Sequence, residues 1–387
     1  MGLVNWRRWT VWTAAVGLAF SAGTILCPAQ EKAPRTPKIQ MAILLDTSNS
    51  MDGLINQART QLWAVVQEFT TIKLAGHQPQ LEVALFEYGN TSLPAAEGFI
   101  RLVLPLTGDL DKISEAMWAL RTNGGDEFCG QVIDRAVRSL TWSTSSKDVK
   151  CIFIAGNEPF TQGTFEYTKA CQAAANHGIT VNTIFCGPTE EGIATKWEDG
   201  AKLADGKYLN IDQNQVDVAV STPQDAEINR LGLELNQTYL AYGSRQRQEE
   251  VLTRQVAQDA NASSAATGIA VSRAAVKASQ FYRNADWDLI DALEGKQVKL
   301  EELKAEDLPE ALRGKSLAEQ RQIVDVKASQ RKDIQEKIRK LNDARQTHLA
   351  AARKLMEADA AAAGQPAPAA AFSRAVVEAV VEQAGKK

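Results

Sequence analysis

The feature that most constrains this chain is an apolar run followed at once by a polar loop. Residues 39–45 are almost all apolar, which is typical of a strand buried on both faces of a sheet. Asp46, Ser48 and Ser50 follow in the spacing D-x-S-x-S, and a helical pattern then begins. Such residues are common in turns and at helix N-termini. Three oxygen-bearing side chains at the carboxyl end of a buried strand can also form part of a cage for a hard divalent cation.

The stretches that follow alternate between strand and helix patterns. Strand patterns recur at residues 81–88, 99–106, 150–155, 179–186 and 207–211. Helical patterns cover residues 54–73, 109–120, 130–140, 164–177, 190–204 and 222–241. This alternation predicts an α/β, Rossmann-like fold with a mostly parallel, doubly wound sheet. We expect the strands at 81–88 and 99–106 to pair antiparallel at one side, because only a polar loop separates them.

The composition changes beyond residue 243. Residues 244–357 contain no strand pattern and are rich in Ala, Gln, Glu, Lys and Arg, so we expect an α-helical region. Within it, residues 317–356 predict one long helix. Along that helix four residues follow one another at intervals of seven: Val324, Arg331, Ile338 and Arg345. Because two arginines do not suit a coiled-coil seam, we expect a helical hairpin or a helix packed on the first domain.

The N-terminus has the layout of a secretory signal peptide. Arg7 and Arg8 precede an apolar stretch rich in small residues, and a cleavage site is possible after Ala29. We therefore expect a signal peptide over residues 1–29 and an exported protein, periplasmic or secreted. If the stretch stays uncleaved, it would serve as a signal anchor in the inner membrane. Residues 30–37 resemble a short linker.

The C-terminal residues 358–387 form the last predicted segment. Residues 358–371 are rich in Ala and Pro, which indicates a linker. A short helix over residues 373–384 follows, with its valines on one side. It is either a frayed tail or a docking peptide.

Charge and motifs exclude several classes of function. The net charge is −4 and charged residues make up 23%, so no basic surface points to nucleic acid. None of the three histidines has the spacing of a metal ligand or a catalytic triad, and the sequence has neither G-x-S-x-G nor a phosphate-binding loop. Cys129 and Cys186 are the only candidate nucleophiles, and neither has an evident base. We predict that the protein is not an enzyme, with a metal-assisted hydrolase as the least favoured alternative.

Four cysteines would remain after export, which permits disulfides in an oxidising compartment. They are Cys129, Cys151, Cys171 and Cys186. Cys129 follows a Gly-rich loop and Cys186 ends a strand, so both should lie at the same edge of the sheet. A bridge between them would brace the binding loops. Buried free thiols are the alternative.

Several motifs together carry a family resemblance. DTSNSM after an apolar strand, with TNGGDEFCG, FIAGNEPFTQG and NTIFCGP further on, resembles the von Willebrand factor type A family, and more narrowly exported bacterial proteins with this domain. The resemblance covers residues 38–243. It implies a metal-ion-dependent adhesion site, in which D-x-S-x-S joins a Thr and an Asp from two later loops. The implied roles are metal binding by the hydroxyls of Ser48 and Ser50, and an indirect role for Asp46 through waters or hydroxyls.

Two loops depart from that family pattern. Gly124-Gly125 is followed by Asp126 and Glu127 where the family has Thr, and Gly156 stands where the Asp after the fourth strand is expected. A carboxylate moved to Asp126 or Glu127 would keep the charge of the ligand set, whereas a degenerate site would hold no ion tightly. We predict a retained site for Mg²⁺, or for Mn²⁺ or Ca²⁺. Its predicted ligands are Asp46, Ser48, Ser50, Asp126 and Glu127.

The resemblance implies a binding module whose cation leaves one coordination position open for a carboxylate of a protein partner. The alternative is a metal-independent structural protein of the envelope, which acts through its C-terminal helices. We expect no nucleic-acid partner, and membrane contact only if the N-terminal segment stays uncleaved.

Overall fold

The computed structural model describes residues 1–2, 36–70, 72–74, 76–211, 220–265, 268–362 and 372–385. The chain divides into two units, Met1–Arg35 and Thr36–Lys387, and every helix and strand described here lies in the second. Apart from Met1 and Gly2, the predicted signal peptide falls outside the described residues, as does most of the predicted linker. No helix in the described ranges is long and apolar enough to span a bilayer.

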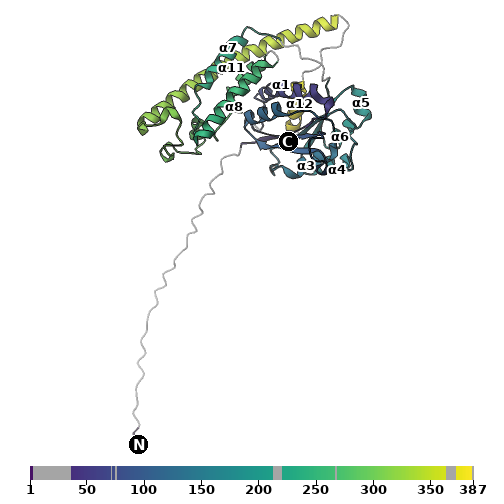
Figure 1. Cartoon of the computed structure of the whole chain (residues 1–387), viewed down its shortest axis with the longest axis horizontal. Helices are drawn as coiled ribbons and strands as arrows, with labels where there is room; N and C mark the ends of the chain where they lie inside the picture. Colours follow the sequence, from purple (N-terminus) through teal and green to yellow (C-terminus); the bar gives the residue numbers. More distant parts are fainter. Residues whose placement is uncertain are drawn as a thin grey trace. The chain divides into compact units, whose positions relative to one another are not determined.

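Six strands form one sheet in the order β3-β2-β1-β4-β5-β6 (Figure 1). The strands are β1 (Lys38–Asp46), β2 (Gln80–Tyr88), β3 (Ile100–Thr107), β4 (Val149–Gly156), β5 (Thr180–Cys186) and β6 (Tyr208–Ile211). β3 lies at the edge and pairs antiparallel with β2, while the other pairings are parallel. The predicted fold class and the antiparallel pair at one side are therefore confirmed.

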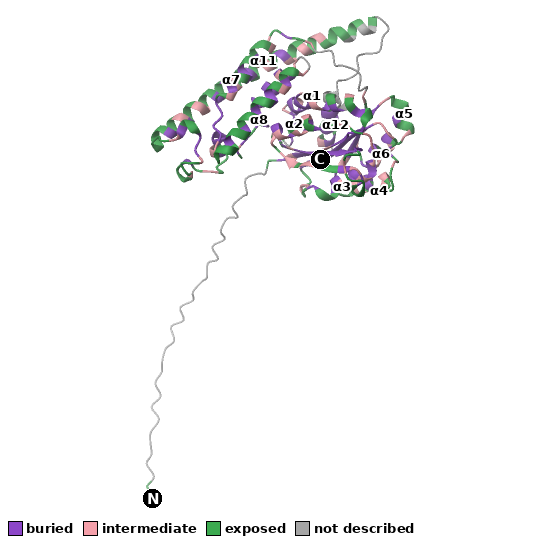
Figure 2. Ribbon diagram, viewed as in Figure 1, coloured by how far each residue is buried: buried purple, intermediate pink, exposed green. Residues whose placement is uncertain are grey.

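Helices cover both faces of this sheet. They are α1 (Asp52–Phe69), α2 (Leu110–Ala119), α3 (Cys129–Ser139), α4 (Tyr167–Asn176), α5 (Thr189–Ala194) and α6 (Trp197–Leu203). Figure 1 shows α1 on one face and α3 and α4 on the other. β1 is buried on both sides, because Met41 belongs to the apolar core under α1 and Leu44 to the core under α3. The four inner strands β1, β2, β4 and β5 accordingly lie among the most buried parts of Figure 2, whereas the edge strands β3 and β6 are more exposed.

Two predicted helices differ from the structure. Residues 190–204 form two short helices, α5 and α6, because Lys196 between them adopts a left-handed backbone with φ of +77°. The helix expected over residues 222–241 is shorter, spanning Asp225–Asn236 as α7. Thr222 lies before it and donates from its hydroxyl to Asp225 at 2.6 Å.

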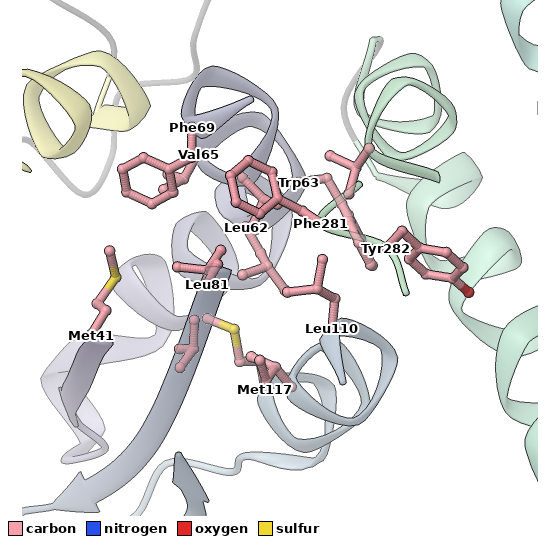
Figure 3. Close-up of a cluster of buried hydrophobic side chains, with 14 of the residues drawn as sticks. Met41, Leu62, Trp63, Val65, Phe69, Leu81, Leu110, Met117, Phe281 and Tyr282 are labelled. Atoms are coloured by element: carbon pink, nitrogen blue, oxygen red, sulfur yellow. The ribbon is translucent and has the colours of Figure 1, made fainter. Parts of the chain in front are cut away.

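The region after residue 243 is helical, as predicted, and holds no strand within 244–265 and 268–362. Its helices are α8 (Arg245–Ser264), α9 (Ile269–Lys277), α10 (Leu289–Glu294) and α11 (Leu317–Ala362). Its core is continuous with that of the sheet, since Trp63 on α1 and Phe281 share one cluster (Figure 3). The predicted domain boundaries at residues 243 and 357 stay predictions.

The two arginines in the α11 register are buried and paired with carboxylates. Arg331 donates to Asp288 at 2.6 Å and to Asp291 at 3.1 Å. Arg345 donates to Asp225 at 2.9 Å. These pairs explain why the register departs from a coiled coil: α11 packs on helices of its own unit, with α7 among its main neighbours.

The last helix, α12 (Phe372–Gly385), packs against α1 and β4. Val376, Val377 and Val380 are buried there, whereas Val381, expected on the same side, is 48% exposed. Gln383 exchanges hydrogen bonds with Thr180 and Asn182 of β5. Of the two alternatives for the C-terminus, the structure has the docked helix. Residues 358–362 of the predicted linker belong to α11, which continues to Ala362, and residues 363–371 lie outside the described part.

Candidate metal site

The polar loop after β1 is a tight turn at the carboxyl end of the sheet. Asp46 is the last residue of β1 and is 0% exposed. Its Oδ1 atom accepts a hydrogen bond from the backbone N–H of Ser48 at 2.7 Å. The backbone N–H of Thr47 donates to the carbonyl of Tyr88 at the end of β2, at 2.9 Å. The loop then forms a short 3-10 helix, Asn49–Met51, that leads into α1.

The two serines of the motif lie side by side. Their hydroxyl oxygens are 3.0 Å apart, with Ser48 buried and Ser50 exposed. The hydroxyl of Ser50 also donates to Oδ1 of Asn157, at 3.2 Å. Asn157 follows β4 and was missed by sequence reasoning, although it directly follows Gly156 in a loop that the resemblance had singled out.

Glu127 joins this group from the Gly-rich loop before α3. It is 3% exposed, and its backbone N–H donates to Oε1 of Gln162 at 2.5 Å. Its Oε2 atom lacks a hydrogen-bond partner, as does Oδ2 of Asp46. Buried polar atoms of this kind are uncommon in folded proteins and require an explanation, such as an ion.

The pKa values of these two buried carboxyl groups are raised, as expected where no positive charge lies beside them. Burial, followed by the negative charge of Glu127, raises the pKa of Asp46 well above its ordinary value. Burial also raises the pKa of Glu127. A divalent cation beside them would offset both effects. Asp46, Glu127 and the serine hydroxyls are oxygen donors of the kind that Mg²⁺ and Ca²⁺ prefer, so the residues present fit such an ion.

Asp126 does not join this group. Its side chain is exposed, and it makes no hydrogen bond or ion pair with any described residue. Of the five predicted ligands, the structure therefore brings together Asp46, Ser48, Ser50 and Glu127. The described ranges contain no group of three or more His, Cys, Asp or Glu side chains arranged to hold a metal, so the candidate set depends on hydroxyl oxygens as well.

The predicted disulfide between Cys129 and Cys186 is wrong. All four cysteines of the described part are buried free thiols. Cys129 packs in the core under α3 and Cys186 in the core under α1, so the sheet separates them. Burial raises the pKa of both thiols well above its ordinary value. Protonated, enclosed thiols are poor nucleophiles, so neither cysteine suits the catalytic role considered for it.

Comparison with known proteins identifies the part of the chain that holds this site. The family profile of the von Willebrand factor type A domain matches residues 40–195. No curated protein matches the chain.

The solved structures to which this chain shows similarity include three bacterial proteins. BatB from Bacteroides thetaiotaomicron is 15% identical, with 57% of this chain and 98% of that one covered and a TM-score of 0.35. An aerotolerance-related membrane protein from Bacteroides fragilis is 17% identical, with coverages of 45% and 92% and a TM-score of 0.32. The vWF domain of the pilus tip protein Mfa5 from Porphyromonas gingivalis is 12% identical, with coverages of 46% and 90% and a TM-score of 0.33.

Proposed function

Because residues 40–195 are a von Willebrand factor type A domain, we propose that this protein is a non-enzymatic binding module that holds a divalent cation at the Asp46 loop. Domains of this family commonly bind a divalent metal there. The observation that carries the proposal is the buried pair Asp46 and Glu127, in which each side chain has an oxygen without a partner. Leaving two such groups unpaired would cost several kcal/mol, roughly 1–3 for each group.

Each residue of the site has a distinct task in this proposal. The hydroxyls of Ser48 and Ser50 and the carboxylate of Glu127 bind the ion. Asp46, which is held by the backbone N–H of Ser48, accepts from these hydroxyls or from waters. Asn157 orients the hydroxyl of Ser50. The ion in this proposal is Mg²⁺, with Mn²⁺ and Ca²⁺ as alternatives, because such hard cations accept mixtures of carboxylate, hydroxyl and water oxygens.

The function follows from the exposed side of the site. Ser50 is exposed, whereas Asp46 and Glu127 are enclosed, so a partner reaches the site from the side of Ser50. When bound, the cation supplies a coordination position for a carboxylate of a protein partner. The protein is exported in this proposal, to the periplasm or beyond the cell, and the support for this is the predicted signal peptide. An uncleaved segment would anchor it in the inner membrane.

A metal-independent scaffold is the second candidate function. The observation that favours it is the C-terminal end of α11, where Leu355 is 67% exposed and Met356 37% exposed. Helical surfaces of this kind serve interactions without any cation. In that case the helices would carry the contact and the sheet would only support them.

Calorimetric titration with Mg²⁺ and Mn²⁺ tests the proposal. We expect saturable heat for the wild-type chain and none for Asp46→Ala, with circular dichroism to verify that the variant is folded. No saturable heat in the wild type would contradict the cation site and favour the scaffold. Pull-down from the exported fraction, with and without EDTA, would then identify a partner whose capture depends on the ion.

A further inference from the structure

Two neighbouring residues at the end of β2, Tyr88 and Gly89, lie against both loops that could offer a carboxylate to Asp46. We infer that this pair decides which loop supplies it: Tyr88 excludes a side chain at position 156, and Gly89 leaves the space through which Glu127 reaches Asp46. The inference rests on the proposed cation site, and it assigns a positioning role to two residues that bind no ion themselves.

The end of β4 has no room for a carboxylate. A Cβ atom on Gly156 would lie 2.6 Å from the Tyr88 hydroxyl oxygen, 3.1 Å from Cη2 of Trp197 and 3.2 Å from Oδ2 of Asp46. The first distance is shorter than any real Cβ contact, so even alanine would require a shift of its neighbours. An aspartate, which the family pattern predicts at this position, is larger still.

The two aromatic side chains that close this space are firmly held. Tyr88 is 0% exposed, donates from its hydroxyl to the carbonyl of Ala155 at 2.9 Å, and accepts from the thiol of Cys129 at 3.8 Å. Trp197 is buried and donates from Nε1 to the carbonyl of Glu158 at 2.8 Å. Moving either ring would break a hydrogen bond and disturb a close-packed core.

Whereas Tyr88 leaves no room for a side chain at position 156, Gly89 leaves room for a side chain from the Gly-rich loop. A Cβ atom on Gly89 would lie 2.8 Å from Oδ1 of Asp46 and 2.8 Å from Cγ of Glu127, so the two acidic side chains approach each other across the space that this glycine leaves. A Cβ atom on Gly125 would lie 2.5 Å from the carbonyl oxygen of Gly89, so the loop packs on β2 with its backbone. Any larger residue at 89 would push Glu127 away from Asp46.

The consequence is that the second carboxylate of the site comes from the loop before α3 and not from the loop after β4, while the total charge of the ligands stays the same. Tyr88 removes the acidic side chain from the β4 loop, and Gly89 admits Glu127 from the loop before α3. This also separates Glu127 from its neighbour Asp126, which points to solvent. A site that takes its second carboxylate from this loop thus requires Gly89 at the end of β2 as well as the acidic residue itself.

The first test compares two glycine variants of the full chain. Gly89→Ala and Gly76→Ala both place alanine at a left-handed position, with φ of +77° and +80°, but nothing lies within 4 Å of a Cβ atom on Gly76. Backbone strain is therefore matched. We expect Gly89→Ala to weaken Mn²⁺ binding by about 10- to 100-fold, measured from the electron paramagnetic resonance signal of free Mn²⁺. Gly76→Ala should bind Mn²⁺ as the wild type does.

The second test needs no metal. In EDTA, Gly156→Ala should lower the Tm more in the wild-type background than in Tyr88→Phe, because removing the hydroxyl removes the closest clash. Additivity of the two changes would overturn the role of Tyr88. Equal Mn²⁺ affinity of Gly89→Ala and Gly76→Ala would overturn the role of Gly89.

These outcomes also separate this inference from the proposed function. A wild-type chain that binds no Mn²⁺ contradicts the cation site, and with it the claim that Gly89 serves a cation. The coupling between Tyr88 and position 156 is measured from Tm values in EDTA and does not depend on Mn²⁺ binding. Non-additive Tm changes therefore support the exclusion of a side chain by Tyr88 even if the chain binds no Mn²⁺. Wild-type binding that is lost in Glu127→Gln but kept in Asp126→Asn supports the relocated carboxylate, and the reverse pattern overturns it.

Discussion

Arg273 on α9 donates to Asp111 on α2 at 2.6 Å, and this buried ion pair joins residues that are 162 positions apart in the sequence. The same guanidinium donates to Asp259 on α8 at 2.5 Å and lies over the ring of Trp63, 4.4 Å from its centroid. A single side chain thereby connects the helices of the C-terminal region to those that cover the sheet.

We predict that Arg273→Met destabilises the protein by about 3–5 kcal/mol, because Asp111 would remain buried without a cation and Asp259 would keep only Lys277 at 3.2 Å. Urea denaturation followed by circular dichroism measures this. Arg230→Met is the control: Arg230 pairs with Glu227 and Glu234 on the exposed face of α7 and should show no comparable loss. Similar losses for both variants would contradict a special role for the buried pair.

The C-terminal helix offers a matched pair of neighbouring valines. Val380 is 0% exposed and Val381 is 48% exposed on the same turn of α12. We expect Val380→Asp to lower the free energy of unfolding by about 3 kcal/mol, since it places an unpaired charge in the core. Val381→Asp should change it little. If both variants melt like the wild type, α12 does not dock on the sheet in solution.

Lys277 should make a contribution to stability that grows with pH in the alkaline range, whereas the buried thiols of Cys129 and Cys186, whose pKa is raised, contribute in the opposite direction. Burial lowers the pKa of Lys277 to about 8 in the folded chain, although Asp259 partly opposes this. The unfolded chain keeps an ordinary lysine pKa near 10.4. Between these values the unfolded state binds a proton that the folded state has released, so the contribution of Lys277 to the free energy of unfolding increases with pH in this window.

Denaturation series at about pH 7.5, 8.5 and 9.5 on wild type and a Lys277 variant isolate this contribution, because the cysteines, which ionise in the same range in the unfolded chain, are common to both proteins. The Lys277→Met variant should lack the lysine contribution, so the difference between wild type and variant should change with pH. A difference that stays constant across the series would mean that Lys277 titrates normally in the folded protein.

Added Mg²⁺ should stabilise the chain through its site. At a concentration about 100 times the dissociation constant, a ligand that binds only the folded state adds about 2.7 kcal/mol. We expect a rise in Tm for the wild type and none for Glu127→Gln, measured by differential scanning calorimetry. An equal rise in both would indicate a general salt effect rather than binding at this site.

The sequence was sufficient for the sheet and for the position of the D-x-S-x-S loop. Residues 39–45 predict β1 because an apolar run of that length indicates a strand that is buried on both faces. In the structure Met41 and Leu44 accordingly lie in the apolar cores on the two faces of the sheet. The D-x-S-x-S loop was expected at the carboxyl end of that strand, and the structure has it there. These are local properties, which follow from the alternation of side chains along a strand.

Tertiary contacts decided what local patterns could not. Asp126 and Glu127 are adjacent in an irregular loop, where no periodicity tells which side chain faces inward. The structure turns Glu127 toward Asp46 because Gly89 leaves space for it. The thiols of Cys129 and Cys186 lie on opposite faces of one sheet, which their positions along the chain did not reveal.

The amino-acid sequence alone therefore determined the strands, most of the helices and the loop that carries Asp46, because hydrophobic periodicity and turn chemistry act over a few residues. Only the tertiary structure decided that Glu127 faces Asp46 and that Arg273 meets Asp111. Such contacts depend on the space that distant residues leave, and that space exists only once the whole unit has packed.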